Sequence, residues 1–351
     1  MKEIIIDGVV INDDSNSYVI AEIGHNHQGN LETCRQMFEV AEECGADAVK
    51  LQKRDNHALY TEILYSQPYD HRNSYGKTYG EHRDFLEFGK NEYLELKQYA
   101  EELNVAFIST PFDYSSVDFL AEIDLSAYKI ASGDLNNSPL QMRIASLGKP
   151  MFLSTGGGTI DDVQRAYDTI MPINSQLCIM QCTASYPCEA EEMNLNVIET
   201  YRERFPDVVV GLSDHQNGIS MSLVAYTLGA RVFEKHFTLN HAWQGTDHAF
   251  SLEPIGLKKM IRDLRHAREA LGDGIKTPYS SEKAPLYKMG KKLVAANDLE
   301  EGHVLTIDDI AIKSPNDGLP PYELENVLGK ILTHSIHADE NISFQVLSDP
   351  E

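Results

Sequence analysis

The feature that most constrains the fold of this chain is a regular alternation of short apolar runs with longer amphipathic segments. Eight runs have the composition of buried strands, at residues 18–24, 47–53, 105–110, 127–132, 150–155, 177–183, 208–213 and 231–237. A dozen or more residues separate successive runs, which is enough for helical crossovers between parallel strands. Segment 31–45 is typical of the crossovers, with apolar residues at helical spacing and Gly45 as a stop.

This alternation predicts a (β/α)8 barrel over residues 1–272, because eight β/α units fit within about 250 residues. The stretches "GADAVKLQK" (45–53) and "GARVFEKHF" (229–237) resemble each other, as expected for a barrel of like units. The main alternative is a doubly wound open sheet, which usually has fewer strands and a GxGxxG turn after the first. No such turn follows residues 18–24.

Two regions fall outside the repeating pattern. From about residue 290 short β runs are broken by Asp, Gly and Pro, which predicts a small β-rich domain over 290–351, joined by a polar linker at 273–289. The insertion 54–89 is rich in Tyr, His and Arg and is too long for a simple loop. It is either a functional lid or subunit contact, or a structural excursion.

The chain is strongly acidic, with 30 Lys and Arg against 54 Asp and Glu and a formal net charge of −24. Such a surface repels nucleic acid and anionic membranes, so neither is an expected partner. An anionic substrate would need a local basic group to overcome this field. Five cysteines without a CxxC motif, no secretory signal and no apolar run near the ~18 residues that span a bilayer make the cytoplasm the expected compartment.

Polar side chains lie at the carboxyl end of every predicted strand, which is the edge where barrel enzymes carry their chemistry. They are Glu22, Lys50, Gln52, Ser109, Thr110, Lys129, Ser132, Ser154, Gln181, Thr183, Ser213, His215, Glu234 and His236. A barrel built for stability alone would not place polar groups so uniformly on one rim, so we expect an enzyme. Lys50 and Lys129, with the serines around them, suit a phosphate or carboxylate.

His215 and His236 end neighbouring strands, so their imidazoles are expected to point at one spot. Either histidine alone is more simply a core or surface residue, but the adjacent pair favours a divalent metal site with positions open for substrate oxygens. Glu22 is either a paired structural carboxylate or a general base. Asp247 is placed to accept hydrogen bonds from substrate hydroxyls.

Several motifs, in order, resemble those of the sialic acid synthases (N-acetylneuraminate synthases). They are "AEIGHNHQGN", "KLQK", "GKTYGEHRDFLEF", "KIASGDLNN", "QCTASYPCEAEEMNL", "GLSDHQNGI", "EKHFTL" and "GTDHAFSLEP", and the C-terminal segment resembles the antifreeze-like (SAF) domain of that family. The resemblance implies condensation of phosphoenolpyruvate with N-acetylmannosamine, consuming water and releasing phosphate. It also implies a divalent ion, with manganese as the first choice and magnesium or cobalt as alternatives, and a domain-swapped homodimer.

The resemblance also implies roles for individual residues. The metal ligands are His215 and His236, the catalytic residues are Glu22, Lys50 and Lys129, the phosphoenolpyruvate contacts are Lys50, Lys129, Ser132, Ser154 and Ser213, and the sugar contacts are Gln52, Asp134, Tyr186 and Asp247. Three positions depart from the family pattern. Asp134 stands where many bacterial members have Glu, Ala184 where some members have Asn, and Ser314 where bacterial members carry an Arg that reaches the sugar.

Alternative functions remain open from the sequence. "QKRDN" and "GKTYGEH" are similar to the animal-type enzymes, which use a 6-phosphorylated sugar, and Lys53, Arg54, Arg72 and Arg83 are candidates for the extra basic site. A sister synthase could also take mannose or a legionaminic or pseudaminic acid precursor. A non-catalytic sugar- or ice-binding protein would leave the polar rim unexplained, and the tail lacks a regular Thr array.

Overall fold

The structure, a computed structural model, describes residues 2–350. The chain forms two compact units, the first ending at Gly272 and the second beginning at Asp273. Within residues 2–350, no helix is both long enough and apolar enough to cross a membrane.

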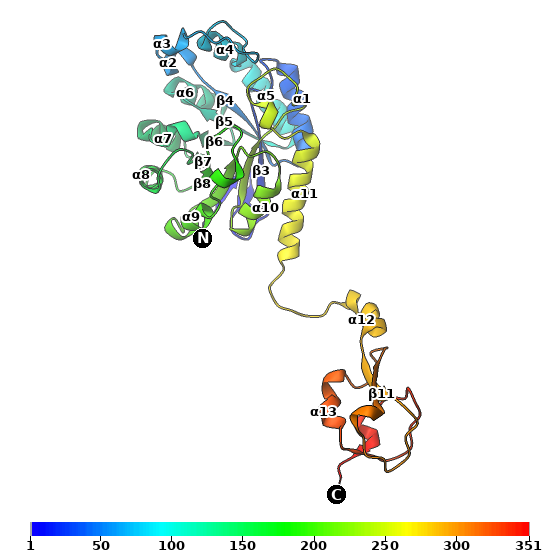
Figure 1. Cartoon of the computed structure of the whole chain (residues 1–351). Coiled ribbons are helices and arrows are strands. Elements are labelled where there is room, and N and C mark those ends of the chain that lie inside the picture. The colour runs from blue at the N-terminus through cyan, green and yellow to red at the C-terminus, as the bar shows by residue number, and fades with distance from the viewer. Residues whose placement is uncertain (1, 351) are drawn as a thin grey trace. The chain divides into compact units, whose positions relative to one another are not determined.

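The first unit is a closed barrel of eight parallel strands with helices around it (Figure 1). The strands are β3 (Tyr18–Gly24), β4 (Ala48–Lys53), β5 (Ala106–Pro111), β6 (Ala127–Ile130), β7 (Met151–Ser154), β8 (Leu177–Cys182), β9 (Val209–Asp214) and β10 (Val232–His236). Strand β10 pairs with both β3 and β9, which closes the sheet. Each strand lies within two residues of its predicted bounds, and the predicted barrel is confirmed.

Helices occupy the connections between the strands. They are α1 (Leu31–Glu43), α5 (Lys90–Leu103), α6 (Tyr114–Ile123), α7 (Ser138–Ala145), α8 (Ile160–Ile170), α9 (Val197–Arg204), α10 (Ser220–Thr227) and α11 (Pro254–Leu271). Helix α1 shows why they form where they do: the Asn30 side chain accepts from Thr33 N at its start, and Cys34, Met37 and Phe38 are buried along one face.

The insertion 54–89 is ordered into three helices, α2 (Asn56–Leu59), α3 (Glu62–Tyr65) and α4 (Tyr79–Leu86). It is tied to the loop that follows β10, because Gln244 Nε2 donates to Ser74 O at 2.8 Å and the Tyr75 hydroxyl donates to Gln244 O. The insertion therefore contacts the carboxyl end of the barrel.

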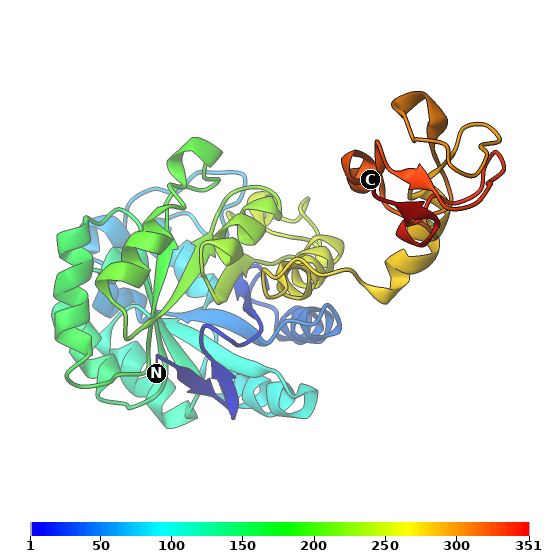
Figure 2. The ribbon, with the colours of Figure 1, turned by 90° about the horizontal axis from the view of Figure 1, so that it is seen from below.

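Alternate side chains of each strand face the barrel interior. The layers toward the amino ends are apolar, for example Ile20, Ala48, Ile108, Phe152 and Val232. A hairpin of β1 (Ile4–Ile6) and β2 (Val9–Ile11), dark blue in Figure 2, packs Ile4, Ile6 and Ile11 against these layers. Because apolar side chains fill the layers near the amino ends, the polar side chains of the interior lie at the carboxyl end.

The second unit contains short antiparallel strand pairs around its own core. Strand β11 (Lys292–Ala295) pairs with β12 (Ile310–Lys313), and β13 (Ile331–Leu332) pairs with β14 (Leu347–Ser348). Its helices are α12 (Lys283–Met289), within the predicted linker, and α13 (Leu324–Val327). Its core includes Leu293, Leu305, Val327 and Ile342.

Candidate active site

A cavity of about 530 Å³ lies at the carboxyl ends of the barrel strands. Its lining contains every site residue named from the sequence except Asp134, namely Glu22, Lys50, Gln52, Lys129, Ser132, Ser154, Tyr186, Ser213, His215, His236 and Asp247. These residues are up to 225 positions apart in the sequence. They meet at one place because each lies near the carboxyl end of a barrel strand or in the loop that follows it.

The charge of this cavity is opposite to that of the chain. Four cationic side chains line it, those of Lys50, Lys129, Arg54 and Arg83, against the three carboxylates of Glu22, Glu234 and Asp247. A chain with a net charge of −24 therefore has a weakly basic cavity. This is the local basic group that an anionic substrate requires.

Glu22 is held between two partners from β4. Lys50 Nζ lies 2.6 Å from one carboxylate oxygen of Glu22, and Gln52 Nε2 donates to the other at 2.6 Å. All three side chains point inward, and Glu22 and Lys50 are only 1% and 2% exposed. A buried carboxylate with a lysine on one oxygen and an amide on the other is held in a fixed orientation.

Glu234 links the two lysines and was not assigned a role from the sequence. Lys129 Nζ donates to its Oε1 at 2.9 Å, Ser213 Oγ donates to the same oxygen at 3.2 Å, and Lys50 Nζ lies 3.8 Å from Oε2. Although burial opposes ionisation, Lys129 and Lys50 lower the pKa of Glu234 to about 2. The sequence feature that could have identified Glu234 is its position two residues before His236, because side chains two apart on a strand lie on the same face, here the inward one.

The serines named as phosphate contacts surround the lysines. Ser154 Oγ is buried and has no hydrogen-bond partner in the described residues, so it has bonding capacity to offer a ligand. Ser132 Oγ accepts from Gly156 N at 3.0 Å, and a Cβ on Gly156 would lie 2.7 Å from that oxygen. Glycine is therefore required for this close approach.

His215 and His236 face each other with ring centroids 5.5 Å apart. Burial lowers the pKa of both imidazoles, which favours the neutral, ligating form. His215 Nδ1 lies 2.9 Å from Thr183 O, so it carries the proton and leaves Nε2 free to ligate. His236 Nδ1 is buried without a hydrogen-bond partner, and Asp247 Oδ2 lies 3.9 Å from it.

The donor set fits a divalent transition ion with two imidazole ligands, because an orphaned buried nitrogen costs free energy unless something binds it. Within residues 2–350 no group of three or more His, Cys, Asp and Glu side chains gathers into a complete metal cage. Any ion held here would keep positions open for other oxygens.

The residues named as sugar contacts divide into two groups. Gln52, Tyr186 and Asp247 line the cavity, and the Tyr186 ring lies 4.2 Å from that of His215. Asp134 does not line it, since this residue sits in the 3-10 turn Ser132–Asp134 and its carboxylate accepts from Asn137 Nδ2 at 2.9 Å. The family resemblance placed Asp134 among the sugar contacts, and this role stays a prediction.

Two of the four basic residues named for a phosphosugar reach the cavity. Arg54 and Arg83 line it, whereas Lys53 is bound by Glu87 at 2.9 Å and Arg72 lines a separate hollow beside Trp243. Arg83 comes from α4 of the insertion, so the insertion contributes directly to the cavity.

The two arginines share a single histidine. Arg54 Nη1 lies 3.3 Å from His25 Nε2, and Arg83 Nη1 lies 3.3 Å from His25 Nδ1. Burial holds the pKa of His25 well below its usual value, and a neutral imidazole has only one acceptor nitrogen. Glu87 binds Lys53 through Oε2, and its Oε1 lies 3.4 Å from His25 Nε2 and 3.9 Å from Arg54 Nη1. The His25 ring can therefore accept from only one of the two guanidinium groups, and the N–H of the other is available to an anion.

Comparisons with known proteins show the family of the chain. The chain is 39% identical to human N-acetylneuraminate-9-phosphate synthase over 95% of this chain and 93% of that protein. It is 35% identical to the Campylobacter jejuni N,N'-diacetyllegionaminic acid synthase over 92% of this chain and 98% of that protein.

Among solved structures, N-acetylneuraminic acid (sialic acid) synthetase from Leptospira borgpetersenii superposes with a TM-score of 0.71 at 30% identity, covering 81% of this chain and 95% of that one. Residues 37–276 match the NeuB family and residues 292–346 match the SAF domain. The resemblance expected from the motifs is confirmed, and the chain belongs to the NeuB family.

Proposed function

We propose that this synthase of the sialic acid type condenses phosphoenolpyruvate with N-acetylmannosamine, consuming water and releasing phosphate. The observation that carries the proposal is the buried set of Lys50, Lys129 and Glu234, ringed by serines, beside two neutral imidazoles in one cavity. Such a set suits an anionic substrate next to a carbonyl oxygen.

The proposed reaction forms one carbon–carbon bond and breaks one carbon–oxygen bond. C3 of phosphoenolpyruvate attacks the aldehyde carbon, water adds at C2, and the bond between C2 and the bridging oxygen then breaks as phosphate leaves. The aldehyde oxygen takes up one proton and becomes a hydroxyl. The water that adds at C2 loses two protons in all, and its oxygen becomes the oxygen of the new ketone. These two protons balance the one gained by the aldehyde oxygen and the one gained by the released phosphate.

The lysines and serines hold the phosphoenolpyruvate. Lys50 and Lys129 each have three N–H donors, and their carboxylate partners leave donors for the phosphate and carboxylate of the substrate. Ser154 Oγ, which has no partner in the described residues, adds a further donor. These fixed charges stabilise the negative charge that grows on the phosphate as it leaves.

Glu22 is the proposed acceptor of the first proton from the attacking water. Gln52 and Lys50 fix both of its oxygens, so the carboxylate is oriented before the substrates arrive. Burial of this part of the cavity excludes bulk water and limits addition to the positioned molecule.

His215 and His236 are the proposed ligands of a divalent ion, with manganese as the first choice. When bound there, such an ion supplies Lewis-acid polarisation of a carbonyl oxygen. The side chains of Tyr186 and Asp247 lie beside the imidazoles and are placed to orient the sugar.

N-acetylmannosamine 6-phosphate is a second candidate acceptor. It is favoured by the cavity-lining arginines, Arg54 and Arg83, whose donors exceed the acceptors around them. The human relative is named as a 9-phosphate synthase, which agrees with such an acceptor.

The test is phosphate release from phosphoenolpyruvate with N-acetylmannosamine, its 6-phosphate and mannose as acceptors. We expect release with an N-acetylated acceptor, its loss after chelation and its return with manganese. If a chelator leaves phosphate release unchanged, the metal role is contradicted. If no acceptor gives phosphate release, the proposed reaction is contradicted.

Arg83→Gln separates the two acceptors. If the sugar is phosphorylated, kcat/KM should fall at least tenfold for the 6-phosphate and less than threefold for the free sugar, because a charged hydrogen bond contributes about 1.5–3 kcal/mol. Arg72→Gln removes the same charge outside the cavity and is the control. An equal fall with both sugars would argue against a phosphate at Arg83.

A further inference from the structure

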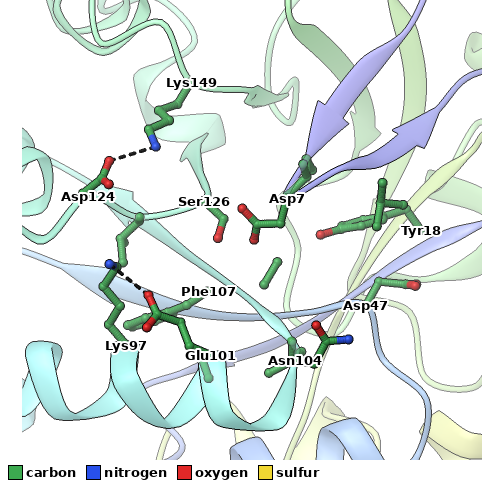
Figure 3. A pocket seen from close by; sticks show the side chains of 16 residues that line it. Asp7, Tyr18, Asp47, Lys97, Glu101, Asn104, Phe107, Asp124, Ser126 and Lys149 are labelled. Atoms are coloured by element: carbon green, nitrogen blue, oxygen red, sulfur yellow. Dashed lines mark ion pairs between the residues drawn. The ribbon is translucent and has the colours of Figure 1, made fainter.

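A second cavity, of about 440 Å³, lies at the opposite end of the barrel (Figure 3). Its walls come from the amino ends of β3 and β5, the turn of the β1–β2 hairpin and the end of α5, and they include Tyr18, Phe107, Asp7 and Asn104. None of its lining residues lines the active-site cavity. The proposed reaction gives this space no role.

Tyr18 is the feature of this cavity that points to a ligand. Its side chain is only 2% exposed, and its hydroxyl has no hydrogen-bond partner in the described residues. In Figure 3 the hydroxyl is directed toward Asp7 and Ser126 rather than into the apolar core. Burial raises its pKa well above the usual value, so it remains a donor, and an unsatisfied buried donor of this kind costs about 1–3 kcal/mol.

The charges around the cavity favour a cation. Its two lysines are already paired at the rim, Lys97 with Glu101 at 3.0 Å and Lys149 with Asp124 at 2.8 Å (Figure 3). This leaves Asp7 and Asp47, which pair with neither lysine.

Asp47 is anchored at the cavity wall. One of its carboxylate oxygens accepts from Val19 N at 2.7 Å, and Arg265, which is not part of the lining, is the cation that acts on it electrostatically. In Figure 3 the Asp47 carboxyl is directed away from Asp7, so Asp47 contributes negative charge to the wall rather than a contact beside Asp7.

Other ligand classes fit this cavity less well. An anion would meet four carboxylates and two lysines that are already paired. The volume is that of a small-molecule site rather than of a single ion.

We propose that this cavity binds a small hydroxylated amine. Its ammonium group lies against the carboxylate of Asp7, and one of its oxygens accepts from the Tyr18 hydroxyl, with Asp47 adding negative charge to the wall. The site is separate from the proposed condensation and does not depend on it.

The probe for this site is D-glucosamine, titrated calorimetrically into the full-length protein, with N-acetyl-D-glucosamine as its uncharged match. We expect glucosamine to bind once per chain and N-acetylglucosamine at least tenfold more weakly, because only the first carries an ammonium group. Absence of glucosamine binding, or equal binding of both sugars, overturns the proposal.

Two variants locate the binding. Tyr18→Phe removes the donor, and Asp7→Asn removes one charge at a position with φ of 47°, which asparagine tolerates. Each should weaken glucosamine about tenfold. Asp14→Asn removes the same charge nearby but outside the cavity and should change affinity less than twofold. Unchanged affinity in the first two variants would place glucosamine elsewhere and overturn the assignment.

The thermal stability of Tyr18→Phe checks the premise separately. Removing a hydroxyl that has no partner in the folded chain should leave the Tm unchanged or raise it. A clear fall in Tm would mean that the fold itself satisfies the hydroxyl, and the argument for a ligand would fail.

Discussion

At the scale of single residues, buried carboxylates and lysines pair with one another in the active-site cavity. Glu234 is the common partner of two lysines, and Glu22 binds one of them. Glu22 and the lysines were predicted from their strand-end positions. The central place of Glu234 was not, because a strand-end position does not tell which carboxylate a lysine from a distant strand will meet.

Removing this carboxylate should destabilise the fold and strengthen anion binding. Glu234→Gln leaves Lys129 without its charged partner, so we expect a loss of about 3 kcal/mol in the free energy of unfolding. Inorganic phosphate should restore more stability in this variant than in the wild type. Urea denaturation with and without phosphate measures both effects. The exposed Glu39→Gln on α1 is the control, and equal stability of the two variants would contradict the account.

Asp47 gives a prediction for the pH dependence of stability. Burial raises the pKa of its carboxyl to about 6 from an ordinary value of 3.8, against the opposing effects of Val19 N–H and Arg265. Because this pKa is higher in the folded state, the protonated form favours folding. The stability it contributes is fully present below about pH 4 and is lost as pH rises through about 6.

Asp47→Asn should remove this loss, because the amide oxygen still accepts from Val19 N–H and carries no charge. Relative to the wild type, the variant should therefore gain stability between pH 4.5 and pH 7.5. Urea denaturation at these two pH values measures the difference. Parallel behaviour of the two proteins would show that Asp47 titrates normally.

At the scale of elements, the sequence predicted the barrel strands closely because their apolar runs are long and regularly spaced. It did not predict the β1–β2 hairpin, whose strands of three residues are too short to show a period. The family resemblance placed Asp134 in the site, and the structure puts it in a 3-10 turn where its carboxylate accepts from Asn137.

The insertion 54–89 offers a test at this scale. Gln244 links it to the loop after β10 through Ser74 and Tyr75. Gln244→Ala removes the side-chain hydrogen bond, worth about 1 kcal/mol net, so amides of residues 74–83 should exchange with deuterium about fivefold faster. Exchange of amides in β6 and β7 serves as the internal reference. Unchanged exchange in 74–83 would mean that other contacts hold the insertion.

At the scale of the whole molecule, a strongly acidic chain carries a weakly basic cavity at one end of its barrel. The global charge and the need for a local basic group were both readable from composition. The second unit has its own core. The proposal that each SAF domain caps the barrel of a second chain rests on family resemblance.

The proposed homodimer has a direct test in light scattering of the full-length protein. We expect a mass twice that of one chain at concentrations used for activity assays. A monomer that retains full activity would contradict an active site completed by a neighbour's domain.

The most direct test of the central claim follows the bridging oxygen of phosphoenolpyruvate. Substrate labelled with ¹⁸O between C2 and phosphorus is turned over with the preferred amino sugar, and both products are weighed by mass spectrometry. Addition of water at C2 followed by carbon–oxygen cleavage predicts that the label leaves with phosphate and is absent from the new keto acid. Label retained in the sugar product, or phosphate released without the sugar, would contradict the account.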